Sequence, residues 1–251
     1  MVSEQLPLWA DPAPDPTERP KVLLRNSNAD LRRDGIYVWT LPALAVRLPD
    51  GRSVKTCPAA GVCAQVCYAR FGTYTWRTVK AAHLRNLLFV LEDPEGWERA
   101  MLAELARAKF TGKYVRLHDA GDFFSDDYTE AWLRIIRARP GTQFYCYTKE
   151  VRRFRRMVEP DRPANLRWAY SLGGREDHLL DTDSDRIADV FPTAQGITDA
   201  GWHPQTESDL LAVLGPKPVG MAANNIPQAK KRQGDRTLGE WQRAEDARRR
   251  R

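Results

Sequence analysis

The sequence predicts an α/β fold in which a parallel β-sheet is wrapped by helices. Short apolar runs alternate with longer amphipathic segments at the spacing of β-α-β units, and polar residues directly follow several of these runs. The chain of 251 residues has 42% hydrophobic and 29% charged residues, and no apolar run approaches the ~20 residues of a membrane span. These properties exclude a membrane protein and a wholly disordered chain. Four cysteines are too few for a disulfide scaffold, so we expect a cytoplasmic protein.

The chain begins with a proline-rich leader and a β-hairpin. Residues 1–20 contain five prolines and several acidic residues, so we expect this leader to be disordered. Residues 36–56 have strand-like patterns, and Asp50-Gly51 is a strong signal for a hairpin whose second strand runs into Cys57. Two helices are predicted next, over residues 73–92 and 94–110.

From residue 114 onwards, predicted strands and helices alternate. Strands are predicted over residues 114–118, 144–148, 166–172, 187–191 and 218–222. Helices are predicted over residues 126–139, 149–157 and 208–214. We therefore expect one α/β domain over residues 21–229 and a basic C-terminal helix or tail over residues 230–251. The core is expected to include Trp39, Trp76, Trp97, Trp132 and Trp168.

Positive charge is concentrated in two segments of the chain. Residues 230–251 hold nine Lys/Arg and four Asp/Glu, which accounts for +5 of the net charge of +6. This segment is either a phosphate-binding arm or a solvated helix, and we expect Trp241 to dock it on the domain. The second segment is the helix over 149–157, which carries Arg152, Arg153, Arg155 and Arg156. These arginines form an ordinary solvated face or, in the alternative, a contact for nucleic acid.

Three of the four cysteines lie within eleven positions on a loop that follows a predicted strand. Five residues separate Cys57 from Cys63, and three separate Cys63 from Cys67. Three thiolates on one loop are suited to a soft metal. They would hold a [4Fe–4S] cluster with one iron open to another ligand, whereas zinc would need a fourth protein ligand. That ligand would come from Cys146, His83 or His118. We expect cluster binding, and we expect Cys146 to be a small buried apolar residue.

Polar residues follow the predicted strands at their carboxyl ends, where ligands bind in parallel α/β sheets. We predict that a cofactor is bound by His118, Asp119, Gly121, Asp122, Ser171 and Asn224. Tyr147 and Lys149, at the end of the strand over 144–148, are the predicted catalytic residues. In an alternative interpretation, His118, Asp119 and Asp122 hold magnesium in a hydrolase or nuclease.

Three segments of the chain resemble a known family. CPAAGVCAQVCYA, HDAGDFF and YCYTK are similar to the phage gene-product-88 family over roughly residues 20–230, and more distantly to three-cysteine phage proteins that resemble radical S-adenosylmethionine (SAM) enzymes. The resemblance implies a partial (β/α) barrel in which Cys57, Cys63 and Cys67 hold a [4Fe–4S] cluster and SAM binds its open iron. It also implies that Ala120-Gly121-Asp122 takes the place of a Gly-Gly-Glu-like segment that contacts the SAM amino group. The spacing between cysteines differs, because radical SAM enzymes usually have three and then two intervening residues.

The function implied by this resemblance is that of an iron–sulfur protein of the radical-SAM type. Its reduced cluster would donate an electron to SAM and release a 5′-deoxyadenosyl radical. Such a protein needs a reductant for the cluster, and the basic segments point to a nucleic-acid-related substrate. The alternative is a non-enzymatic nucleic-acid-binding protein of a phage or mobile element, stabilised by zinc or a closed cluster. Whether the protein is an enzyme stays open at this point.

Overall fold

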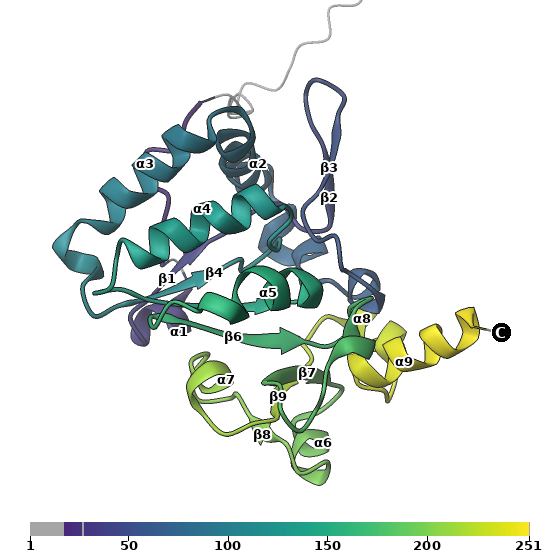
Figure 1. The fold of residues 1–251 in the computed structure, drawn as a ribbon. Helices are drawn as coiled ribbons and strands as arrows, with labels where there is room; N and C mark the ends of the chain where they lie inside the picture. The colour runs from purple at the N-terminus through teal and green to yellow at the C-terminus, as the bar shows by residue number, and fades with distance from the viewer. Residues whose placement is uncertain (1–17, 27, 251) are drawn as a thin grey trace, which may run out of the picture.

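We describe the fold in a computed structural model that covers residues 18–26 and 28–250, so most of the predicted leader lies outside the described residues (Figure 1). Within these residues, the central sheet has seven strands in the order β1-β4-β5-β6-β7-β9-β8, and every pairing is parallel. The strands are β1 Ile36–Trp39, β4 Tyr114–Leu117, β5 Gln143–Thr148, β6 Leu166–Ser171, β7 Ile187–Phe191, β8 His203–Pro204 and β9 Val219–Ala222. The predicted α/β class is confirmed, and the sheet is open, with β1 and β8 at its edges.

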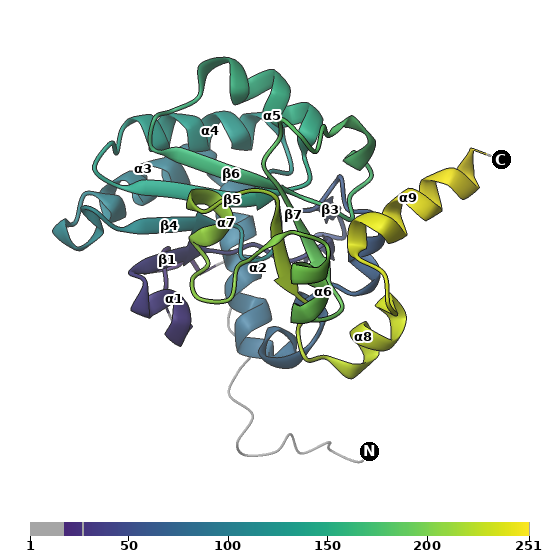
Figure 2. The ribbon, with the colours of Figure 1, turned by 90° about the horizontal axis from the view of Figure 1, so that it is seen from below.

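Helices lie on both faces of this sheet, with α3, α4 and α5 on one side and α7 on the other (Figures 1 and 2). The helices are α1 Ala29–Arg33, α2 Arg77–Glu92, α3 Pro94–Leu105, α4 Asp126–Arg137, α5 Val151–Met157, α6 Ala194–Asp199, α7 Leu211–Leu214, α8 Pro227–Gln233 and α9 Leu238–Arg249. The predicted hairpin is confirmed as β2 Ala45–Arg47 paired antiparallel with β3 Ser53–Lys55, and it stands out from the body. In the described part of the chain, no helix is both long and apolar enough to cross a membrane.

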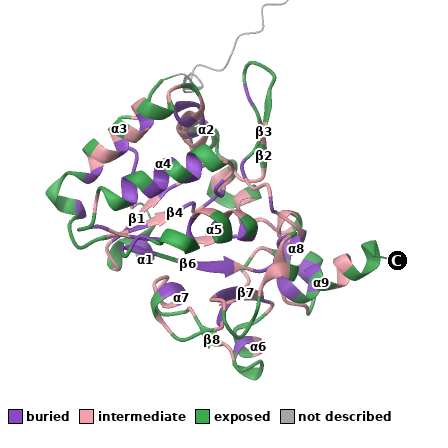
Figure 3. Ribbon diagram, in the orientation of Figure 1, coloured by how far each residue is buried: buried purple, intermediate pink, exposed green. Residues whose placement is uncertain are grey.

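The main core lies between the sheet and helices α3, α4 and α5, as the buried residues on their facing sides show (Figure 3). Trp39, Trp97 and Trp132 are fully buried there, with ring centroids 5.2 to 6.3 Å apart. Ser125 caps α4 by accepting a hydrogen bond from the amide of Tyr128, as its position before the predicted helix indicated. Burial of such aromatic side chains is worth several kcal/mol each and makes this layer the main source of stability.

Three features differ from what the sequence predicted. The helix expected from residue 73 begins at Arg77, because residues 68–70 and 72–75 form two 3₁₀ turns, η2 Tyr68–Arg70 and η3 Gly72–Thr75. Trp76 lies between these turns and α2 and is 61% exposed, so the prediction that it fills the core was wrong. The short elements α1, α6, α8 and β8 were not predicted, since each has too few residues to show a clear periodicity.

The predicted basic tail packs on the domain through the first half of α9. Trp241 is 5% exposed, and together with Leu238 it contacts Val62 next to the cysteines. The guanidinium of Arg236 lies 4.8 Å from the Trp241 ring centroid. A capping box between Thr237 and Glu240 starts the helix, whose far end points away from the body in Figures 1 and 2. The expected docking role of Trp241 is therefore confirmed.

Candidate functional site

A cavity of about 690 Å³ lies at the carboxyl edge of the sheet. All of the residues that the sequence predicted to bind a cluster or cofactor or to act in catalysis border this cavity. They are Cys57, Cys63, Cys67, His118, Asp119, Gly121, Asp122, Tyr147, Lys149, Ser171 and Asn224. The loops that follow β4, β5, β6 and β9 meet the cysteines there, as a parallel sheet requires.

The cysteine loop, residues 57–67, begins where the hairpin ends. The amide of Cys57 donates to the carbonyl of Leu44 (3.1 Å), and the amide of Leu44 donates to Sγ of Cys57 (3.2 Å). Burial, together with the charge of Asp122, raises the pKa of Cys57 to about 12. Burial also raises the pKa of Cys63 and Cys67. These thiols are therefore protonated at neutral pH and would have to release protons to bind a metal.

Gly61 fixes the position of the cysteine loop against two distant segments. A Cβ at this residue would overlap Oε1 of Gln242 and would lie 2.8 Å from the carbonyl oxygen of Gly173. The amide of Cys63 donates to that same Gly173 carbonyl (3.2 Å). The amide of Val62 donates to Oε1 of Gln242 (2.8 Å), which lies on α9. The close approach that only glycine allows thus holds the loop between α9 and the segment after β6.

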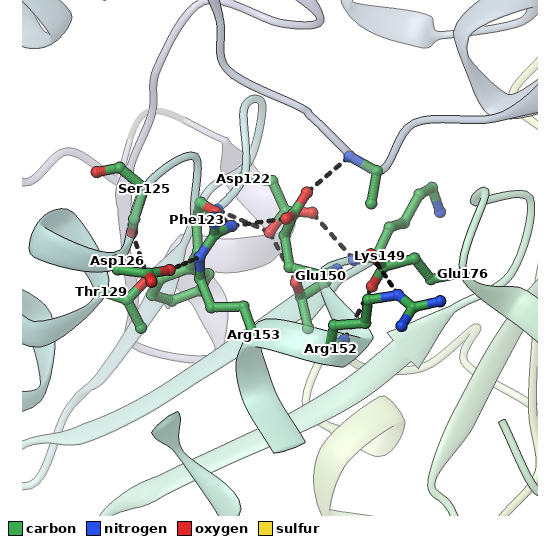
Figure 4. A network of polar contacts seen from close by, with 12 residues as sticks. Asp122, Phe123, Ser125, Asp126, Thr129, Lys149, Glu150, Arg152, Arg153 and Glu176 are labelled. Carbon is green, nitrogen blue, oxygen red and sulfur yellow. Dashed lines mark hydrogen bonds and ion pairs between the residues drawn. The ribbon is translucent and has the colours of Figure 1, made fainter. Parts of the chain in front are cut away.

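Asp122 connects the loop after β4 with the end of β5 (Figure 4). Its carboxylate accepts hydrogen bonds from the amide of Phe123 (2.8 Å), the hydroxyl of Thr148 (2.8 Å) and the amide of Lys149 (3.0 Å). Its own amide donates to the carbonyl of Thr56, directly before the cysteine loop (2.7 Å). Burial raises the pKa of this carboxyl above its usual range, although the three donors oppose the shift. Asp122 therefore organises the cavity wall.

Glu150 joins the cysteine loop to α5 in the same network (Figure 4). One carboxylate oxygen accepts from the amide of Ala59 (2.8 Å), and the other pairs with Nη1 of Arg153 (2.6 Å). Burial, reinforced by the negative charge of Asp122, raises the pKa of Glu150 to about 8. The buried side chain of Glu150 is thus a second support for the cysteine loop, and only its place after Lys149 could have pointed to it.

The predicted catalytic residues Lys149 and Tyr147 both border the cavity with their polar atoms engaged. Nζ of Lys149 donates to the carbonyl and the hydroxyl of Ser171 (2.8 Å each) and to the carbonyl of Leu172 (2.9 Å). These bonds use all three ammonium protons and connect the ends of β5 and β6. The hydroxyl of Tyr147 donates to a carboxylate oxygen of Asp209 (3.0 Å).

His118 and Gly121 shape the loop after β4. The imidazole of His118 is 3% exposed and its Nε2 lies 2.8 Å from the hydroxyl of Tyr128, on the helix side. Burial lowers the pKa of His118 to about 3, so the ring is neutral. Gly121 has φ of 85°, and a Cβ there would lie 2.7 Å from Cβ of Leu41. The glycine therefore allows this loop to pack on the segment after β1.

A largely buried polar cluster, part of which borders the same cavity, was not predicted. Nη1 of Arg116 lies 3.2 Å from Asp209, and Nη2 lies 3.4 Å from Asp119. The hydroxyl of Tyr145 donates to the same Asp209 carboxylate (2.5 Å), which also accepts from Tyr147. The sequence carried one signal for this cluster, the arginine in the middle of the otherwise apolar run 114–118. Alternate residues of a strand face opposite sides of the sheet, so this arginine lies on a different side from its apolar neighbours.

In the described residues, no three His, Cys, Asp or Glu side chains are grouped so that they could hold one metal ion. Cys146 is fully buried in the core on the helix side of β5, which confirms that it is a small buried residue. The His118 ring is turned toward Tyr128. The zinc site with a fourth ligand from Cys146, His83 or His118, and the magnesium site suggested at His118, Asp119 and Asp122, therefore do not assemble among the described residues.

The arginines of α5 are paired with neighbouring acidic side chains. The pairs are Arg152 with Glu176 (3.7 Å), Arg153 with Glu150 (2.6 Å) and Asp126 (2.9 Å), Arg155 with Asp185 (2.9 Å), and Arg156 with Asp126 (2.5 Å). Such surface pairs weaken the positive electrostatic potential with which these arginines could attract a phosphate of another molecule. The arrangement matches the solvated face that the sequence suggested, and it does not support a nucleic-acid contact on this helix.

Comparison with known proteins identifies the lineage of the chain. It matches the family model described as gene product 88 over residues 22–251. It is 31% identical over 121 residues to the Gene 88 protein of Mycobacterium phage L5 and 30% identical over 121 residues to that of Mycobacterium phage D29. Each match covers 43% of this chain and 48% of the relative, so the chain spans about half the length of the curated relatives it matches. No solved structure matches the chain. Because the family model covers most of the sequence, this chain belongs to the gene product 88 family.

Proposed function

We propose that this protein is an iron–sulfur protein of the radical-SAM type. The observation that carries the proposal is that Cys57, Cys63 and Cys67 border the same cavity as polar residues from the ends of four strands. The order of the elements supports it as well. The cysteine loop follows the hairpin β2–β3, which comes directly after β1, and the parallel strands β4, β5, β6 and β7 then lie side by side, as in a partial (β/α) barrel.

The three cysteines are the residues that would hold a [4Fe–4S] cluster. Such a cluster takes one thiolate per iron, so its cysteines stand further apart than the ligands of one ion. All three cysteines border the same cavity, as a cluster bound by all three would require. When bound and reduced, the cluster supplies the electron that cleaves SAM.

Several residues of the chain would serve the same chemistry. The ammonium of Lys149 lowers the pKa of Cys63 and Cys67 against the larger effect of burial, so it favours their thiolate forms. Asp119 is partly exposed in the cavity, and its carboxylate would accept hydrogen bonds from the amino group or ribose of SAM. The side chain of Asn224 lies on the exposed rim, where it would contact the same ligand.

The test is anaerobic reconstitution of the full chain with iron and sulfide, followed by reduction and addition of SAM. We expect about four irons per chain, a broad visible absorption band, and release of 5′-deoxyadenosine. Cys63→Ser should abolish the band and the product, whereas Cys146→Ala is the matched control because that thiol lies on the other face of β5. Retention of one zinc and no iron would overturn the cluster, and a cluster that yields no 5′-deoxyadenosine would overturn the SAM chemistry.

A further inference from the structure

The segment that leads from the cysteine loop into α2 carries positive charges and no acidic residue. Between Cys57 and Leu91 there is no Asp or Glu, and there are four Lys/Arg. Three of these, Arg70, Arg77 and Lys80, have exposed side chains. Among the described residues, none of the three forms an ion pair with a carboxylate, in contrast to the arginines of α5. We call residues 70–80 the basic rim.

The basic rim adjoins the cavity and carries an exposed tryptophan. Residues 71–74 border the cavity directly. Trp76 follows two residues later, and its 61% exposure is the highest among the large hydrophobic residues that the structure describes. Its neighbours Thr75 and Thr78 are exposed polar residues, so the ring does not belong to a continuous apolar patch of the kind that buries against a protein partner.

A second hollow of about 270 Å³ extends the basic rim toward α8. It is bordered by Arg70 and Phe71 on one side and by Arg232 on the other. Nη1 of Arg232 donates to the carbonyl of Gln65, which keeps this guanidinium close to the cysteine loop (3.2 Å). Arg70 and Arg232 thus border a hollow beside the cysteine loop, and the exposed Trp76 follows Arg70 six residues later in the chain.

We propose that the basic rim binds single-stranded nucleic acid, with one base stacked on Trp76 and phosphates contacting Arg70, Arg77 and Lys80. An exposed aromatic ring among unpaired cations is the combination that single strands require, because every base has a face to stack and every nucleotide has a charge to neutralise. Delivery of a nucleotide from the rim into the cavity as substrate rests on the proposed function, but the binding itself does not.

The test measures fluorescence anisotropy of labelled single-stranded DNA and RNA with the full chain at several salt concentrations. We expect Trp76→Ala to weaken binding about tenfold or more while Trp76→Phe retains most of it, as loss of one stacked base predicts. Arg70→Gln and Arg77→Gln should each weaken binding and reduce the salt slope by about 0.7. Trp76 is so exposed that its removal should leave the melting temperature nearly unchanged, which excludes misfolding as the cause.

Paired arginines of α5 provide the matched control. Arg152→Gln and Arg155→Gln should leave the affinity unchanged, because their charges are already met by Glu176 and Asp185. The Cys63→Ser variant keeps the basic rim, so its binding separates this proposal from a failure of the cluster chemistry. Absence of binding would overturn the proposal. Binding that is insensitive to Trp76→Ala and is displaced by polyglutamate would also overturn it, and would favour an acidic protein partner instead.

Discussion

The two faces of β5 use neighbouring residues in opposite ways. Phe144, Cys146 and Thr148 point toward the helices, where Phe144 and Cys146 are buried in the main core. Tyr145 and Tyr147 point to the other side, where their hydroxyls reach Asp209. One strand thus separates a layer that stabilises the fold from a wall that presents polar groups to the cavity. Cys146 lies on the core face of this strand, whereas the other three cysteines lie on the loop that borders the cavity.

The largest loss of stability is expected from a substitution on the helix side of β5. Phe144→Ala should lower the free energy of unfolding by about 3–5 kcal/mol, because it removes a fully buried ring from a core that cannot refill the space. Urea denaturation measures the change. A loss below about 1 kcal/mol would show that this face is not the main source of stability.

A smaller effect is expected where the cysteine loop meets α9. Gly61→Ala should lower the free energy of unfolding by about 1–3 kcal/mol, because the added methyl group overlaps Gln242 and the Gly173 carbonyl. The same variant should retain less iron after reconstitution. Gly141→Ala is the control, since a Cβ there would meet only a methyl of Thr111 at 3.9 Å. Equal iron content in the two variants would contradict the role assigned to the close approach at Gly61.

The pH dependence of stability should reveal the buried Glu150. Its folded pKa of about 8 lies above its unfolded value, so the folded state binds the extra proton and this group stabilises the fold fully only at low pH. Stability is then lost as pH rises toward 8, with a slope of at most about 1.4 kcal/mol per pH unit from one group. Glu150→Gln should flatten the melting temperature between pH 5 and pH 8. An unchanged slope would mean that Glu150 is ionised throughout.

The smallest effect is expected on the cavity side. Tyr145→Phe removes one hydroxyl from Asp209, which keeps Tyr147, Gln205 and Arg116 as partners. We expect the free energy of unfolding to fall by about 1 kcal/mol, which is within the range for loss of a single hydrogen bond. A cost comparable to that of Phe144→Ala would remove the distinction between the two faces.

Most of the parallel sheet could be predicted because its strands are apolar runs with clear ends. The site residues followed from the same pattern, since residues after parallel strands converge without further information. Arg116, Glu150 and Gln242 could not be found in this way. Their roles depend on partners 93, 91 and 180 positions away in the chain, and no local spacing encodes such pairs. Trp76 was misassigned because composition does not reveal which tryptophan faces solvent.

The hydrogen bond from Val62 to Gln242 has a consequence for how the protein is made. During translation the cysteines leave the ribosome long before Gln242, which comes 180 residues after Val62. Until Gln242 is synthesised, the Val62 amide has no hydrogen-bond acceptor on α9, and the cysteine loop is not yet held in place. If the protein binds the proposed cluster, its insertion is therefore expected to be a late, post-translational event, and a chain shortened before α9 should accumulate without it, with thiols open to oxidation.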